Sequence, residues 1–116
     1  MSAASRLGGV EWTLGELDGA PLDLADEERA PILVLDLEEA HVTGSGGCNR
    51  LVGSFALAGD ELRFGTLATT RMACSETVLS RERDFLVALA RVTAYELEER
   101  SLTLLAGDRI VARLSC

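Results

Sequence analysis

The sequence contains no lysine: its eleven basic residues are all arginine, set against 19 acidic residues and a single histidine. The absence of lysine excludes Schiff-base chemistry and the lysine of phosphate-binding loops. The net charge of −8 repels nucleic acid and anionic membrane surfaces, so neither is expected as a partner.

Long hydrophobic runs are also missing. No apolar stretch approaches the roughly 18 residues needed to cross a bilayer, so no membrane span is expected. Residues 1–6 lack the apolar segment of a signal peptide. We therefore expect a cytoplasmic protein as the sequence stands, or a periplasmic or secreted one if an export signal has been removed.

Aromatic residues are scarce, with one Trp, one Tyr and three Phe, although 47% of the chain is hydrophobic. The core must therefore consist mainly of Leu, Val and Ala. A chain of 116 residues has the size of one domain. We expect a single, monomeric domain over residues 9–116, preceded by a flexible segment over residues 1–8.

Alternation of apolar and polar residues predicts a chain dominated by short strands, which are joined by turns at Asp18-Gly19, Ala58–Glu61 and Gly107-Asp108. The acidic stretch 21–30 is expected to be a solvated loop. The predicted strands cover residues 10–14, 32–37, 41–43, 51–57, 62–64, 93–97, 102–105 and 110–114.

The period changes once, between residues 75 and 91. There the apolar residues recur every three or four positions, which predicts one amphipathic helix that begins near Ser75 to Thr77 and ends near Arg91. Ser75 or Thr77 can cap its first turn. Strands, one helix and strands again indicate an α+β fold with a dominant antiparallel sheet.

Residues 44–55 hold four of the eleven glycines. Gly44, Gly46 and Gly47 suggest a phosphate-binding loop, but no helix is predicted to follow and no lysine is available. We instead predict a tight turn or bulge that only glycine fits, and Gly53 lies in the strand that follows. Asn49 is expected to adopt a positive φ or to bond its own backbone.

Cys48 within this glycine segment has a counterpart in Cys74. The two could form a disulfide, a buried thiol pair, part of a metal site or a redox switch. Zinc normally needs four ligands, and only His41 and Cys116 could complete the set, without a typical ligand spacing. We therefore expect no metal and no cofactor. His41 is also the only histidine that could act as a base beside a catalytic cysteine.

Three further residues stand out near the helix. Thr70 is expected to satisfy backbone groups, and Met72 is expected to fill the core. Glu82 lies on the apolar stripe of the helix, where a buried carboxylate requires an arginine or backbone amides as partners. We interpret Glu82 as a structural anchor. No constellation of acid, base and nucleophile is visible, so catalytic residues are not predicted.

Taken together, these residues resemble the META/HslJ domain family. The resemblance covers nearly the whole chain, and its most specific part is Gly-Cys-Asn at 47–49 followed by Met-Ala-Cys at 72–74. The other matching residues are Trp12-Thr13-Leu14, Gly19, Val42-Thr43-Gly44, Gly53-Ser54-Phe55, Leu62, Phe64, Thr70, Glu82, Phe85, Leu89, Tyr95 and Leu102-Thr103-Leu104.

The resemblance implies a small curved antiparallel sheet or partial barrel with one helix packed on it. It also implies a non-enzymatic domain linked to stress responses or the cell envelope. We expect an apolar groove, if one exists between helix and sheet, to bind an unknown protein, a peptide or a lipid-like partner. The alternative hypothesis is a thiol redox sensor that uses Cys48 and Cys74.

Overall fold

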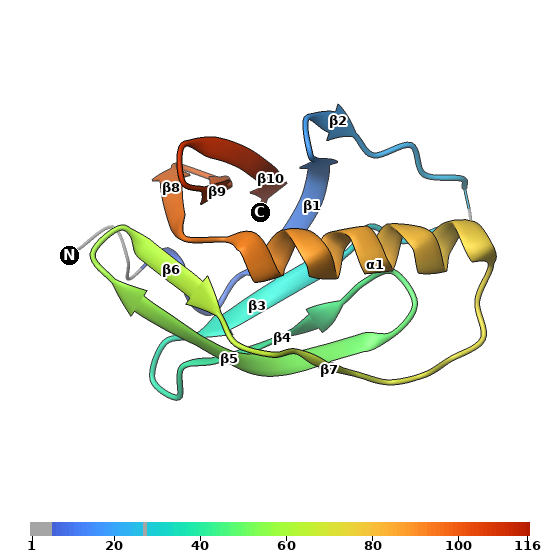
Figure 1. The fold of residues 1–116 in the computed structure, drawn as a ribbon, viewed down its shortest axis with the longest axis horizontal. Helices are drawn as coiled ribbons and strands as arrows, with labels where there is room; N and C mark the ends of the chain where they lie inside the picture. The colour runs from blue at the N-terminus through green and yellow to red at the C-terminus, as the bar shows by residue number, and fades with distance from the viewer. Residues whose placement is uncertain (1–5, 27) are drawn as a thin grey trace.

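The computed structural model describes residues 6–26 and 28–116. Eight antiparallel strands form a closed barrel in the order β1, β3, β4, β5, β6, β8, β9, β10, and β10 pairs again with β1 (Figure 1). Each strand pairs with the next barrel strand along the chain, so the barrel is an up-and-down meander. The predicted α+β fold with a barrel-like antiparallel sheet is confirmed.

The first half of the chain contains β1 (Glu11–Leu17), β2 (Ala20–Pro21), β3 (Ile32–Asp36), β4 (His41–Ser45), β5 (Arg50–Ala58), β6 (Glu61–Phe64) and β7 (Ala68–Thr69). The second half contains α1 (Glu76–Arg91), β8 (Ala94–Glu98), β9 (Ser101–Ala106) and β10 (Arg109–Ser115). The two-residue strands β2 and β7 extend the sheet beside β1 and β5 without joining the ring.

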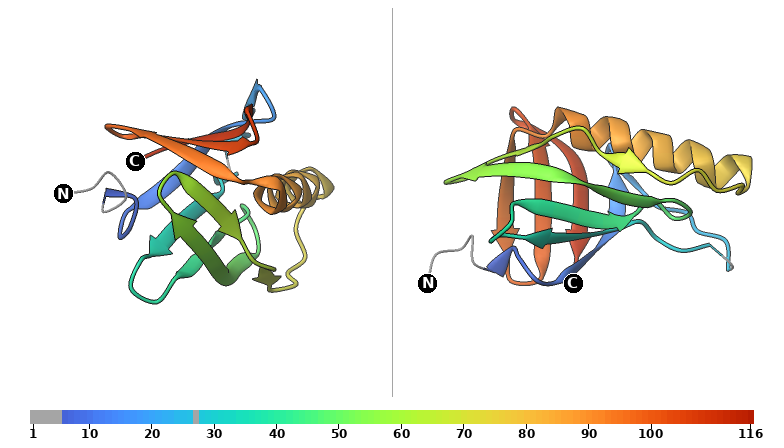
Figure 2. Two further views of the ribbon diagram at one scale, coloured as in Figure 1. Left: turned by 60° about the vertical axis from the view of Figure 1, so that its left-hand side comes forward. Right: turned by 90° about the horizontal axis from the view of Figure 1, so that it is seen from below.

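Figure 2 shows that β8, β9 and β10 cross the direction of β4, β5 and β6, so that the barrel consists of two crossed halves. The halves meet between β6 and β8, where Glu61 lies opposite Ala94. The helix α1 connects them and packs beside β6. Inward side chains from both halves fill the interior, as expected for a barrel of eight strands.

The helix begins and ends close to the predicted positions because its caps are encoded locally. The side chain of Ser75 accepts a hydrogen bond from the backbone N–H of Val78 and so caps the first turn. The face that carries Glu82, Phe85 and Leu89 is buried against the barrel. Within the described residues, no helix is both long enough and apolar enough to cross a membrane.

The ordered domain begins earlier than the sequence predicted. The side chain of Leu7 has no exposed surface, and its carbonyl accepts a hydrogen bond from Trp12 Nε1 at 2.9 Å. Gly9 also donates its backbone N–H to the carbonyl of Leu35. The segment expected to be flexible, residues 1–8, therefore contributes a core residue. Its first five residues lie outside the described part of the chain.

Candidate functional site

The two candidate cysteines form a disulfide that joins a segment before β5 in the chain to a segment after it. Cys48 lies in the turn between β4 and β5, and Cys74 lies immediately before the helix cap. Cys74 belongs to a segment that we call the strap, residues 65–75, which runs from β6 through β7 to α1. The disulfide therefore holds the glycine-rich turn against the start of the helix. Cys116 is exposed and has a free thiol.

Asn49 connects the same turn to the strap through its side chain. Its Oδ1 accepts hydrogen bonds from the backbone N–H of Met72 at 2.6 Å and from Thr70 Oγ1 at 3.1 Å. Thr70 Oγ1 in turn accepts the backbone N–H of Arg50 at 3.0 Å. The side chain of Asn49 thus reaches across to the strap. It does not bond its own backbone, and its φ is not positive, so that prediction was wrong.

Glu82 meets the other side of Asn49. Its carboxylate accepts the backbone N–H of Asn49 at 2.8 Å and the side-chain Nδ2 at 2.7 Å, and Glu82 is only 5% exposed. The buried carboxylate therefore has two donors from one residue. One of them is a backbone amide, and backbone amides or an arginine were the partners expected from the sequence. We call Asn49, Thr70, Met72 and Glu82 the Asn49 cluster.

The glycines make close approaches possible around this cluster. A Cβ at Gly46 would overlap the Glu82 side chain, so glycine there lets the carboxylate reach Asn49. Gly47 has a φ of 107°, which L side chains rarely adopt. A Cβ at Gly44 would overlap the carbonyl of Ile32, and one at Gly53 would overlap the strap. The tight glycine turn is therefore present at residues 46–49.

Met72 and His41 both lie at the surface. Met72 is 54% exposed, so the prediction that it fills the core was wrong. Its backbone N–H, which binds Asn49, fixes the strap, and its side chain points away from the core. His41 begins β4 and is exposed, at the opposite end of that strand from the glycine turn and Cys48.

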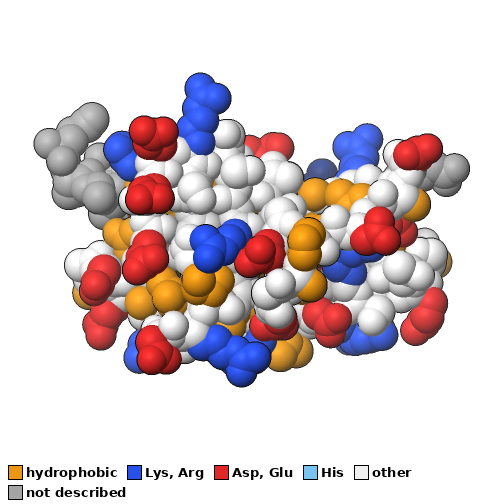
Figure 3. Space-filling model, turned by 90° about the horizontal axis from the view of Figure 1, so that it is seen from above, with side chains coloured by type: hydrophobic (Ala, Val, Ile, Leu, Met, Phe, Trp, Pro, Cys, Tyr) orange, Lys and Arg blue, Asp and Glu red, His pale blue; other side chains and the backbone are white. Residues whose placement is uncertain are grey.

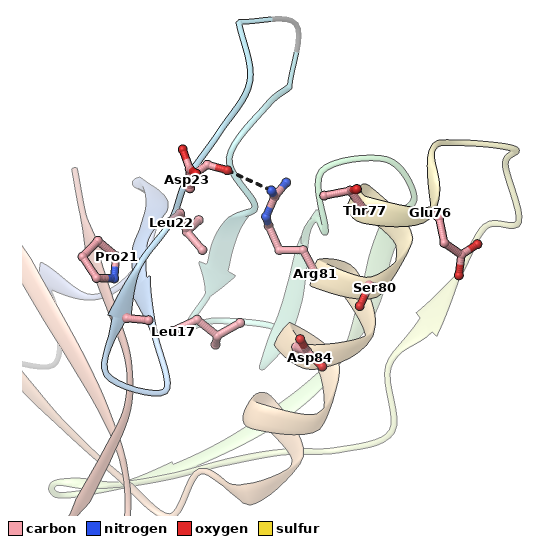
Figure 4. Close-up of a pocket in the computed structure, with 10 residues that line it drawn as sticks. Leu17, Pro21, Leu22, Asp23, Glu76, Thr77, Ser80, Arg81 and Asp84 are labelled. Atoms are coloured by element: carbon pink, nitrogen blue, oxygen red, sulfur yellow. Dashed lines mark hydrogen bonds between the residues drawn. The ribbon is translucent and has the colours of Figure 1, made fainter.

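A groove lies between α1 and the segment around β2, where the sequence analysis had placed a conditional binding site (Figure 4). Its volume is about 630 Å³. One wall is formed by Leu17, Pro21 and Leu22, and the helix contributes mostly polar side chains to the other. We call it the helix groove. Its remaining lining residues are Ala20, Asp23, Glu76, Thr77, Ser80, Arg81 and Asp84.

Arg81 in the helix groove already has protein partners. Its Nη2 donates to the carbonyl of Asp23 at 3.1 Å and to Glu28 Oε1 at 3.2 Å. The hydrogen bond from the backbone N–H of Ala25 lowers the pKa of Glu28 below its ordinary value; burial opposes this shift, and the Arg81 guanidinium adds to it. Arg81 therefore anchors the loop after β2 to the helix.

On the face seen from above in Figure 3, charged side chains are scattered and apolar patches are small.

A second depression lies on the outer surface of β3, β4, β5 and β7, the strands in the lower half of Figure 1. Its volume is about 650 Å³. We call it the sheet hollow. The strand register places its outward side chains in two rows across the four strands. One row is Val34, Thr43, Val52 and Ala68, and the other is Ile32, Ser45, Arg50 and Thr70.

The inward face of this sheet covers the core, so apolar residues on its outward face are unusual. Leu33, Leu35 and Leu51 point inward and are at most 2% exposed. Period-two alternation then assigns Val34 and Val52 to the solvent face, where polar residues are normally found. Val52 is 50% exposed.

The sequence analysis missed the sheet hollow because residues 32–35 form a continuous apolar run. Such a run is typical of a strand that is buried on both faces, so it gives no sign that Ile32 and Val34 point outward. The signal that could have revealed the hollow lies in β5, two strands away from β3. There Leu51 and Phe55 occupy the inward face, so Val52 between them must point outward.

Comparison with known proteins identifies relatives over nearly the entire chain. Residues 5–115 match the META domain. A protein from Burkholderia xenovorans, solved by NMR, is 27% identical, with a TM-score of 0.74 over 97% of this chain and 85% of that one. No curated protein matches the chain.

Two other solved structures share the fold at lower identity. One, solved by NMR, is 24% identical, with a TM-score of 0.74 over 99% of this chain and 95% of the other. The other is the crystal structure of a duf4847 family protein from Bacteroides vulgatus ATCC 8482. It is 14% identical, with a TM-score of 0.68 over 98% and 96% of the two chains. The resemblance derived from the sequence is confirmed.

Proposed function

Because the chain belongs to the META domain family, we propose that it is a non-enzymatic binding domain with a stress-related or envelope-associated role. Its partner is a peptide or a lipid-like molecule, and the binding site is the sheet hollow. The observation that carries this proposal is a solvent face of the barrel on which Val52 is exposed and Ile32 and Val34 are half-buried, in a depression of about 650 Å³.

The choice between the two depressions rests on their linings. In the helix groove the apolar wall faces charged residues, and Arg81 is engaged with the loop. Among the described residues that line the sheet hollow, Arg50 is the one with a charged side chain, and the aliphatic side chains are Ile32, Val34, Leu51, Val52 and Ala68. Apolar surface of this kind gains most from the removal of water.

Backbone amide NMR spectra recorded during titration with panels of peptides and lipids test the proposal. Binding at the sheet hollow is expected to shift the amide signals of β3, β4, β5 and β7. Shifts confined to β2 and α1 would move the site to the helix groove and so contradict the proposal. The absence of any response across both panels would contradict a binding role altogether.

A thiol redox sensor is a second candidate, and the Cys48–Cys74 disulfide is the observation that favours it. A dithiol reductant would transfer two electrons and two protons, giving two protein thiols and becoming a disulfide itself. The Asn49 cluster would then be the remaining link between the turn and the strap. A reversible, peroxide-dependent change in thiol state, accompanied by altered NMR signals in the strap, is expected. A disulfide that mild reductants fail to open contradicts this candidate.

A further inference from the structure

We propose that the ligand of the sheet hollow is a single-chain amphiphile with a carboxylate head, of the fatty acid class, and that Arg50 binds the head. This inference rests on the proposed binding function and specifies its ligand. Three features of the hollow carry it: the aliphatic row, the position of the one arginine, and the absence of backbone groups to bind a peptide on its central strands.

The first feature is the apolar surface. Val34 and Val52 occupy the same row on either side of Thr43, and Ala68 extends the row onto β7. Thr43 adds a methyl group between the two valines. The row therefore offers a continuous strip of methyl groups across four strands, which suits an alkyl chain lying across the sheet.

The second feature is the distribution of charge. Arg50 lies in the adjacent row, and its side chain makes no ion pair with any residue in the described part of the chain. On the other side of the hollow, Glu11 of β1 lies opposite Val34. Arg50 thus places positive charge within the hollow, and Glu11, which is not among the residues that line it, places negative charge beyond its β3 edge. An anionic head is attracted to Arg50 and repelled from Glu11, so the amphiphile has one favoured orientation.

The third feature distinguishes an amphiphile from a peptide. The strands β3, β4 and β5 are each paired on both sides, so their backbone N–H and C=O groups already bind neighbouring strands. A peptide laid on this face would lose water from its own amides without gaining backbone partners. An alkyl chain carries no such groups, and the carboxylate head needs only the guanidinium of Arg50 and the nearby hydroxyl of Ser45.

Isothermal titration calorimetry with dodecanoate, below the concentration at which it aggregates, tests the inference. Dodecylamine carries the same chain with a cationic head, and it is expected to bind more weakly than dodecanoate. Arg50→Gln is expected to weaken dodecanoate binding by about five- to tenfold and to leave dodecylamine binding unchanged or stronger. Val52→Gln is expected to weaken the binding of both.

Matched controls come from the same chain. Arg63→Gln removes an exposed arginine of β6 outside the hollow, and Val87→Gln removes a valine of α1 that is 59% exposed. Neither is expected to alter dodecanoate binding. Because the side chains of Arg50 and Val52 are exposed, both variants should keep the wild-type unfolding temperature. If Val52→Gln does unfold, Val52→Thr keeps the branched shape and tests the same contact.

Failure of this inference can be told apart from failure of the binding function. If dodecanoate does not bind but an apolar peptide binds and Val52→Gln weakens it, the ligand class is wrong and the binding site is retained. Equal effects of Arg50→Gln and Arg63→Gln on dodecanoate also overturn the role of Arg50. If dodecanoate, dodecylamine, the peptide and phospholipid vesicles all fail to bind, both the ligand class and the binding function are wrong.

Discussion

The Asn49→Ala substitution is expected to destabilise the domain more than any ordinary surface change, although Asn49 lies in a turn. The variant loses the bond from Nδ2 to the Glu82 carboxylate and both bonds that Oδ1 accepts from the strap. The carboxylate of Glu82, which is 5% exposed, keeps a single donor. The backbone N–H of Met72 loses its acceptor.

The magnitude follows from the groups left without partners. A hydrogen bond to a buried charged group contributes about 1.5–3 kcal/mol, and an unsatisfied backbone amide costs about 1–3 kcal/mol. With partial relaxation, the free energy of unfolding should fall by about 3–5 kcal/mol. At about 4 °C per kcal/mol for a chain of this size, the unfolding temperature drops by about 12–20 °C.

Urea unfolding followed by the fluorescence of Trp12 provides the assay, because this single tryptophan is 1% exposed in the folded state. The disulfide must stay oxidised in every variant. Glu82→Gln is a graded comparison, since it keeps an acceptor for the backbone N–H of Asn49 but places an amide against Nδ2. A loss smaller than about 1 kcal/mol for Asn49→Ala would refute the reasoning. So would strict additivity of Asn49→Ala and Glu82→Ala in a double-mutant cycle.

Three other outcomes follow from the structure. Alkylation of the native protein without reductant should modify only Cys116, and modification of all three cysteines would contradict the bridge. The double substitution Cys48→Ser and Cys74→Ser should lower the free energy of unfolding by about 3.5 kcal/mol, because the disulfide closes a loop with a separation of 26 residues. Gly44→Ala should lower the free energy of unfolding in urea by about 1–3 kcal/mol, because the added Cβ overlaps a carbonyl of β3. Gly15→Ala is the control and should be tolerated, since the nearest atom outside its chain neighbours is 3.9 Å from the added Cβ. Equal losses of stability in the two variants would contradict the steric argument. Burial raises the pKa of Tyr95, so the folded state retains the phenol proton more strongly than the unfolded chain does, and the free energy of unfolding should fall as the pH rises above about 10. Tyr95→Phe should reduce that fall. An identical pH profile for the variant and the wild-type protein would contradict this role of Tyr95.

The local features of this fold could be predicted because they depend on neighbours in sequence. The helix is defined by a change in hydrophobic period and by the capping side chain of Ser75. The glycine turn is marked by its composition. Barrel closure is different, because the pairing of β1 with β10 joins the two ends of the chain. Nothing in either strand alone identifies the other as its partner.

The same limit applies to the side-chain partners in the candidate site. Glu82 could be recognised as a carboxylate on an apolar stripe, but its partner lies 33 residues away. Asn49 was assigned to local backbone bonding, which is its usual role in turns. In the folded chain the strap, which pairs with β5 through β7 and is joined to the turn by the disulfide, supplies the partners. The strap also explains Met72, whose backbone is fixed while its side chain stays exposed.

The contacts that stabilise the domain and the surface that we propose for binding share one structural element. The strap carries Thr70 and Met72, which bind Asn49, and it also places Ala68 and Thr70 at the border of the sheet hollow. The shape of the hollow therefore depends on the Asn49 cluster and on the disulfide. Substitutions at Asn49 would alter both stability and the hollow. The side chains of Arg50 and Val52 form no part of either support, so they are the positions at which ligand binding can be separated from folding.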